Sequence, residues 1–94
     1  MVENDALEKA LANPAEVMEL NLRYNELTSL PSEIGKLANL EYLVLGDNKL
    51  SSLPADIGQL TNLERIYLGD KRLIEIARAL VVSGCKISYY GLGQ

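Results

Sequence analysis

The sequence predicts an α/β domain: a short right-handed solenoid with a parallel inner sheet, a helical N-terminal cap and a C-terminal cap made of a helix and a strand. Three observations predict it. Residues 17–39 and 40–62 are two copies of one 23-residue unit, each copy contains a stretch that alternates between apolar and polar residues, and a third copy changes into a helical pattern. If each copy is one turn of a coil, the strands of successive turns lie side by side and parallel.

We expect one domain over residues 1–94, since this length is typical of a single folding unit. The expected N-terminal cap is residues 1–16, and the three repeats are residues 17–39, 40–62 and 63–76. The expected C-terminal cap, residues 72–94, overlaps the last repeat.

The N-terminal cap is predicted to be a helix that covers the first coil. Asp5 and Glu8 have the spacing of a capping box, which satisfies backbone N–H groups at a helix start. Pro14 ends the helix, because the residue before a proline avoids helical geometry. One helical face between these points is apolar, made of Leu7, Ala10 and Leu11.

Each repeat is predicted to begin with a short strand. Residues 20–22, 43–45 and 66–68 read LNL, LVL and IYL, and alternation with a period of two is typical of a strand. Asn25 and Asn48 follow the first two strands, where an amide can donate and accept hydrogen bonds to its own coil and the neighbouring one. We therefore expect a ladder of stacked asparagines.

The rest of each repeat is predicted to return outside the sheet. Pro31 and Pro54 fix the backbone there and remove a donor that would have no strand partner. Four aliphatic residues are expected to point inward from this segment: Ile34, Leu37, Ile57 and Leu60. Because the return segment is bulkier than the strand, the strands should line the concave side.

The shared pattern, LxxLxLxxNxLxxLPxxIGxL, resembles that of leucine-rich repeat proteins. It is similar to the 23-residue repeats of many bacterial proteins and of the plant Ras-group-related repeat proteins. The resemblance is close over residues 17–76 and looser at the ends. It implies a scaffold, and a scaffold does not fix the function. Some family members carry kinase, GTPase or ligase domains, which are expected to lie outside a chain of this length.

The third copy departs from the pattern at Lys71, which stands where an asparagine would continue the ladder. We therefore expect no further full coil. Residues 73–82 have apolar residues at helical spacing, and Gly84 is predicted to be the C′ glycine that ends this helix. Bacterial members of the family often end in a similar helix followed by a Cys-Lys-Ile strand.

Residues 85–90 alternate again, which predicts a final strand that closes the open end of the core. Its expected inward residues are Cys85, Ile87 and Tyr89. Its expected outward residues are Lys86, Ser88 and Tyr90.

The composition argues against several classes of partner. A net charge of −4 disfavours nucleic acid and anionic membranes. No segment approaches the length of about 18 apolar residues that a membrane span needs, and the first residues lack the basic and apolar regions of a secretory signal. The single cysteine, Cys85, suits a reducing compartment. We therefore expect a cytoplasmic location, no nucleic acid and no membrane.

The sequence predicts no catalytic residues, no metal and no cofactor. It contains no histidine and no phosphate-binding glycine motif. Cys85 has no histidine to activate it and is expected to be a small core residue. Asp47 and Asp70 occupy equivalent positions, so they could bind Ca²⁺ or share a proton. The favoured interpretation is a solvated pair of carboxylates whose mutual repulsion is reduced by the positive charges of Lys49, Lys71 and Arg72.

The outward strand positions form the candidate binding site. Across the three strands, the expected columns of the concave face are Glu19, Tyr42 and Arg65; Asn21, Val44 and Tyr67; and Arg23, Gly46 and Gly69. Tyrosine and arginine are enriched at interaction hot spots, although β-propensity alone also places aromatic residues on strands. The predicted partner-binding residues are Tyr42, Val44, Arg65 and Tyr67, with Arg23, Glu19 and Asn21.

Two functional hypotheses follow. The first is a non-catalytic protein–protein interaction module that binds a partner of unknown identity through the concave sheet. The second is a structural or self-associating unit, a homodimer for example, that pairs through the strand edge at residues 85–90 or through the tyrosine patch.

Overall fold

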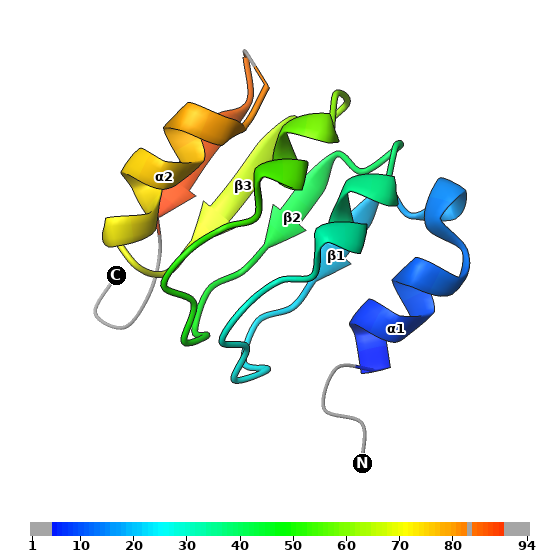
Figure 1. Ribbon diagram of the computed structural model, residues 1–94, viewed down its shortest axis with the longest axis horizontal. Helices are drawn as coiled ribbons and strands as arrows, with labels where there is room; N and C mark the ends of the chain where they lie inside the picture. The colour runs from blue at the N-terminus through cyan, green and yellow to red at the C-terminus, as the bar shows by residue number, and fades with distance from the viewer. Residues whose placement is uncertain (1–4, 83, 90–94) are drawn as a thin grey trace.

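The computed structural model describes residues 5–82 and 84–89 of the chain (Figure 1). It confirms a small α/β solenoid in which strands alternate with helical segments. In chain order the elements are the α-helix α1 (Asp5–Ala12), the 3₁₀ segment η1 (Pro14–Glu16), β1 (Glu19–Asn21), η2 (Ser32–Lys36), β2 (Tyr42–Val44), η3 (Ala55–Gln59), β3 (Arg65–Leu68), α2 (Arg72–Leu80) and β4 (Lys86–Tyr89).

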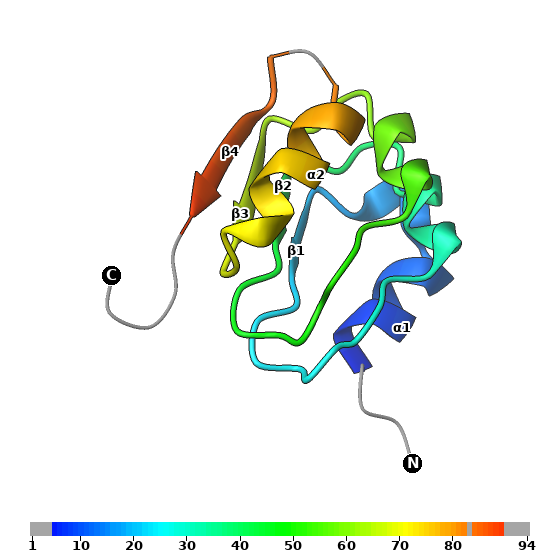
Figure 2. The same cartoon turned by 60° about the vertical axis from the view of Figure 1, so that its left-hand side comes forward.

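The four strands form one parallel sheet in the order β1-β2-β3-β4. Figures 1 and 2 show the sheet as one layer and the return segments as a second layer. The first three strands begin one residue earlier than the sequence predicts. Leu22 and Leu45 follow β1 and β2, and their N–H groups still donate across the sheet at 2.9 Å.

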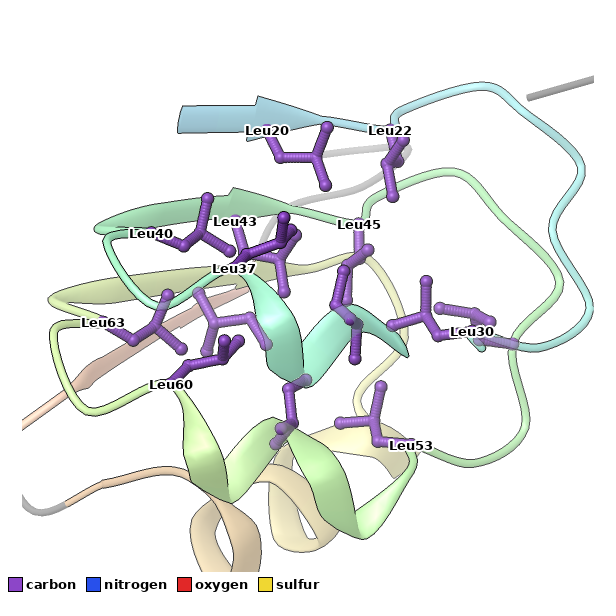
Figure 3. Packing of buried hydrophobic residues seen from close by; sticks show 14 of the residues in the cluster. Leu20, Leu22, Leu30, Leu37, Leu40, Leu43, Leu45, Leu53, Leu60 and Leu63 are labelled. Carbon is purple, nitrogen blue, oxygen red and sulfur yellow. The ribbon is translucent and has the colours of Figure 1, made fainter. Parts of the chain in front are cut away.

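The core lies between the two layers and is almost entirely aliphatic (Figure 3). Leu20 and Leu43 point into it from the strands, and Leu37 and Leu60 reach it from the return segments. The four residues predicted to point inward from the return segments are fully buried. Burying one such side chain stabilises the fold by about 1.5–3 kcal/mol, so the stacked leucines supply most of the stabilisation.

The N-terminal helix α1 lies against β1 and η2, as Figure 1 shows. Its predicted apolar face is confirmed: Leu7 and Ala10 are buried, and Leu11 packs partly against the core. The helix ends at Ala12, two residues before Pro14, as expected. The capping box stays a prediction, because residues 1–4 of this segment lie outside the described residues.

The C-terminal segment contains the predicted helix and strand. Leu73 and Ala77 of α2 are buried, and β4 pairs with β3 in parallel. The prediction for Gly84 is wrong, because α2 ends at Leu80 and Val81 is its extended C-cap residue. Gly84 instead has φ = +92° in the turn before β4, where a residue without a Cβ is favoured. The expectation for Tyr90 falls outside the described residues, as does the rest of the segment to residue 94.

Gly58 shows how closely α2 approaches the coil before it. A Cβ atom on Gly58 would lie 2.9 Å from the carbonyl oxygen of Leu80, at the end of α2. Because that oxygen belongs to the backbone, it could not move aside without shifting the helix. The repeated glycine of the pattern therefore lets the next segment pack closely.

The Asn48 amide joins the first two coils at the point where their strands end. Its Oδ1 atom accepts the backbone N–H groups of Asn25 and Leu27, both at 3.0 Å. Its Nδ2 group donates to three carbonyl oxygens at 2.8–3.2 Å, those of Leu22, Leu45 and Gly46. The predicted ladder is therefore present, with Asn48 serving backbone groups on both coils.

The ladder ends at Lys71, as the sequence predicts. The ladder turns of the first two coils place Tyr24 and Asp47 in the left-handed region, with φ of 62° and 59°. Asp70, the equivalent residue of the third coil, does not adopt this conformation, and its carbonyl oxygen accepts the N–H of Leu73 at 3.0 Å. The chain enters α2 here in place of a further ladder turn.

A second set of amide contacts lies on the return side and was not expected. Asn39 donates to the carbonyl oxygen of Ala15 at 2.7 Å, and Asn62 donates to that of Ala38 at 2.9 Å. Both amides are exposed and make one such contact each, so water can replace them more readily than it can replace the Asn48 amide.

Asn48→Ala should destabilise the protein by about 1–3 kcal/mol, because it leaves several part-buried backbone groups without a partner. Asn62→Ala is the matched control and should cost less, since one exposed contact is lost. Urea or guanidinium melts of the two variants provide the measurement. Equal midpoints would contradict the special role of the ladder amide.

A chain that stops after residue 72 should aggregate or lose its cooperative unfolding transition. Removing α2 and β4 uncovers the buried side chains of Ile66 and Leu68 together with the edge of β3. Light scattering and a thermal melt, each compared with the full chain, provide the measurement. A monomeric truncated chain with a sharp melt would show that the C-terminal segment is not needed to close the core.

Candidate functional site

The sheet face that points away from the core carries the predicted site. Leu20, Leu43 and Ile66 point into the core, so the residues that alternate with them point to the opposite side. We call this the open sheet face. Its residues are Glu19, Asn21, Tyr42, Val44, Arg65, Tyr67, Lys86 and Ser88.

The strand register confirms the predicted neighbours on the first three strands, where Tyr42 lies opposite Glu19 on one side and Arg65 on the other. Arg65 in turn lies opposite Lys86 of β4, a pair that the sequence did not predict. We call these four residues the charged row. Neighbouring strands are about 4.8 Å apart, so adjacent members of the row are close enough to act on one ligand group.

The exposed fraction of the side chains differs along the face. Val44, which was predicted to contact a partner, is more buried than that role requires. Glu19 and Asn21 are exposed, Tyr42 is 36% exposed, and Arg65 and Tyr67 are half-buried. Val44 is only 9% exposed, although it is not part of the core cluster. It lies on an inner strand between the side chains of two neighbouring strands, which leave little of it open to solvent. Val44 therefore supports the face and offers little contact area.

Arg65 is held against an aromatic ring. Its guanidinium carbon lies 5.8 Å from the centre of the Tyr67 ring, within the range of a cation–π contact. The Tyr42 hydroxyl donates a long hydrogen bond of 3.4 Å to the Glu64 carboxylate. The negative charge of Glu64 raises the pKa of the Tyr42 hydroxyl, which therefore stays protonated at neutral pH.

Arg23 lies at the rim of the sheet, where it is engaged by neighbouring residues. Its Nε donates to the Asp47 carboxylate of the next coil at 2.5 Å, and its guanidinium carbon lies 4.8 Å from the Tyr24 ring centre. Tyr24 itself is 66% exposed. Arg23 is therefore paired at the rim of the sheet, and its role in partner binding stays a prediction.

The two equivalent aspartates are each paired with an arginine. Asp47 binds Arg23, and Asp70 binds Arg72 at 2.6 Å. The hydrogen bond from Arg72 lowers the pKa of the Asp70 carboxyl. The sequence predicted Arg72 as a neighbour but missed Arg23. In residues 5–82 and 84–89, no cluster of three or more acidic or cysteine side chains has a geometry suited to a metal ion.

Cys85 has the surroundings of a structural residue. It is half-buried and packs against the core cluster, as expected from the sequence. Burial raises the pKa of the Cys85 thiol, which disfavours the reactive thiolate at neutral pH.

A hollow of about 440 Å³ opens beside the charged row, at the edge where the strands begin. Sequence reasoning missed it. Tyr42, Arg65 and Lys86 line it, and the half-buried Val82 adds apolar surface. The hollow lies between residues 61–64, which precede β3, and Val82 and Gly84, which lie between α2 and β4. The only sequence signal for it is the loss of the repeat pattern after Leu73.

Comparison with known proteins identifies the family of the repeat. The family model described as leucine rich repeat matches residues 15–73, which is more than half of the chain. The chain belongs to the leucine-rich repeat family. Leucine-rich repeat domains are commonly protein-interaction modules.

One similar solved structure is that of a leucine-rich repeat protein of Leptospira interrogans. The two chains are 24% identical, with a TM-score of 0.42. The match covers 88% of this chain and 35% of the other, so this chain spans about a third of that protein's length. Among curated proteins, no relative matches the chain.

In this leucine-rich repeat domain, none of the described helices is both long and apolar enough to span a membrane. The longer of the two α-helices, α2, has nine residues, of which Glu75 and Arg78 form an ion pair at 2.8 Å.

Proposed function

We propose that this leucine-rich repeat domain is a non-catalytic protein-binding module that engages its partner through the open sheet face. The observation that carries the proposal is the row formed by Tyr42, Arg65 and Lys86, with the ring of Tyr67 beside Arg65 and a hollow along one side. Aromatic residues and arginine commonly provide most of the energy at protein interfaces. The family's common use as an interaction module supports the same conclusion.

The state of the polar groups supports a non-catalytic role. The sequence has no histidine, Asp47 and Asp70 are engaged by arginines, and burial keeps the Cys85 thiol protonated. These groups therefore stabilise the fold and are not poised to transfer protons or attack a substrate. A cytoplasmic location is part of the proposal and rests on the single free cysteine.

The residues of the face have different roles in this proposal. Tyr42, Arg65 and Tyr67 contact the partner, and the exposed Glu19 and Asn21 extend the contact toward β1. Val44 supports the face from below, and Arg23 fixes the rim through Asp47.

Self-association is a second candidate function, because β4 is the last strand in the sheet order. Its outer edge has no strand partner within the part of the chain that the structure describes (Figure 2). An open edge can pair with a strand of another copy. Measuring the solution mass over a wide concentration range separates the two functions. A mass that rises toward the dimer supports self-association, and a constant monomer mass supports the binding module.

Arg65→Ala and Tyr67→Ala should each weaken partner binding by about 2 kcal/mol or more, which is roughly 30-fold in Kd. The ring of Tyr67 is rigid, and the guanidinium of Arg65 is a planar fork of hydrogen-bond donors. Both side chains therefore lose little conformational entropy when the partner binds. The measurement is a binding titration with the protein that a pull-down from native lysate recovers. Thermal melts of both variants check the fold, above all for the half-buried Tyr67.

Lys36→Ala and Gln59→Ala are the controls, because both side chains are exposed on the return segments. They should leave the Kd unchanged. If these variants abolish binding while the Arg65 and Tyr67 variants bind normally, the open sheet face is not the interface.

A further inference from the structure

We propose that the partner presents an acidic peptide segment to this domain. In this proposal a carboxylate of the partner binds between Arg65 and Lys86, and a neighbouring apolar side chain enters the hollow beside Tyr42. The inference rests on the proposed function and specifies the chemistry of the partner at the same face.

The first argument is the distribution of charge along the charged row. Glu19 provides a negative charge at the β1 end, and Arg65 and Lys86 provide two positive charges on adjacent strands at the other end. Like charges on neighbouring strands repel each other. A carboxylate between them removes that repulsion and forms charge-assisted hydrogen bonds with both cations.

The second argument is that Arg65 and Lys86 have no acidic partner within the described residues. The ion pairs there use other basic residues and are Arg23–Asp47, Arg72–Asp70 and Arg78–Glu75. The carboxylate nearest in sequence, Glu64, accepts the Tyr42 hydroxyl. Within the described residues, these two cations thus lie on adjacent strands without an ion pair, in a chain whose net charge is −4.

The third argument is that Arg65 is already positioned. Its guanidinium lies over the Tyr67 ring, and the residue is half-buried. A guanidinium held against a ring has lost part of its conformational freedom before binding, so less is lost when the carboxylate arrives. Lys86 is exposed and can adjust its position to the second oxygen of the same carboxylate.

The fourth argument is the hollow next to this pair. Its volume of about 440 Å³ lies in the range of pockets that hold ligands. The half-buried Val82 adds apolar surface to it, and Tyr42 adds one aromatic ring. A peptide with an acidic residue next to an aliphatic one would use both features at once.

The test uses the full chain, labelled with nitrogen-15, and a synthetic decapeptide of alternating glutamate and leucine. Matched peptides carry glutamine or lysine in place of every glutamate, and inorganic phosphate serves as a bare anion. Two-dimensional NMR titrations measure each Kd and identify the amides that shift. The glutamate peptide should bind about 10-fold more tightly than the glutamine peptide, with shifts at Arg65, Tyr67 and Lys86 that weaken as salt is added.

Variants then assign the preference to the two cations. Arg65→Gln and Lys86→Gln should each remove most of the roughly 10-fold preference for glutamate, and Lys86→Glu should bind the lysine peptide more tightly. Lys36→Gln is the matched control, because it removes the same charge from an exposed position on η2. It should bind the glutamate peptide as the unmodified protein does.

Several outcomes would overturn the inference. Equal binding of the glutamate and glutamine peptides at the open sheet face contradicts the acidic preference and leaves the proposed function standing. Shifts confined to the return segments contradict both. If inorganic phosphate binds as tightly as the glutamate peptide, the site binds any anion, and the inference of a peptide partner is wrong. No binding of the glutamate peptide at about 1 mM also overturns the inference, since even a weak specific site is detected at that concentration.

Discussion

The whole structure depends on the spacing of buried leucines from one coil to the next. Leu20, Leu43 and Ile66 lie opposite one another in the register of the sheet, and each packs into the same core. Because side chains alternate along a strand, a slip of one residue would move these side chains to solvent. The same register sets Tyr42 beside Arg65 on the opposite face. The candidate site is thus positioned by the packing of the core beneath it.

Polar groups in this domain are used mainly to join coils. The Asn48 amide binds backbone groups of two coils, and the Arg23–Asp47 pair connects the same two coils at the rim. These contacts fix turns that hydrophobic packing alone would leave free. Arg65 and Lys86, which lie on adjacent strands, are among the cations without an acidic partner in the described residues.

The end of the repeat pattern shapes the site as much as the repeats do. After the third strand the chain enters α2, whose last carbonyl approaches Gly58 closely. β4 then adds a strand to the sheet and brings Lys86 beside Arg65. Both the cation pair and the hollow along it result from this departure from the regular coil. A further regular coil would have placed a different return segment here.

The sequence by itself determined the repeat, the parallel sheet, the core positions and the asparagine ladder, because each follows from a pattern that recurs every 23 residues. It also predicted the columns of the open sheet face. It did not predict the burial of Val44, the Arg23–Asp47 pair or the hollow beside Tyr42. These depend on side chains that are distant in the chain, such as Arg23 and Asp47 at a separation of 24 residues. Tertiary structure decided them, because exposure and charge pairing depend on what the neighbouring coil places beside a residue, which no local pattern records.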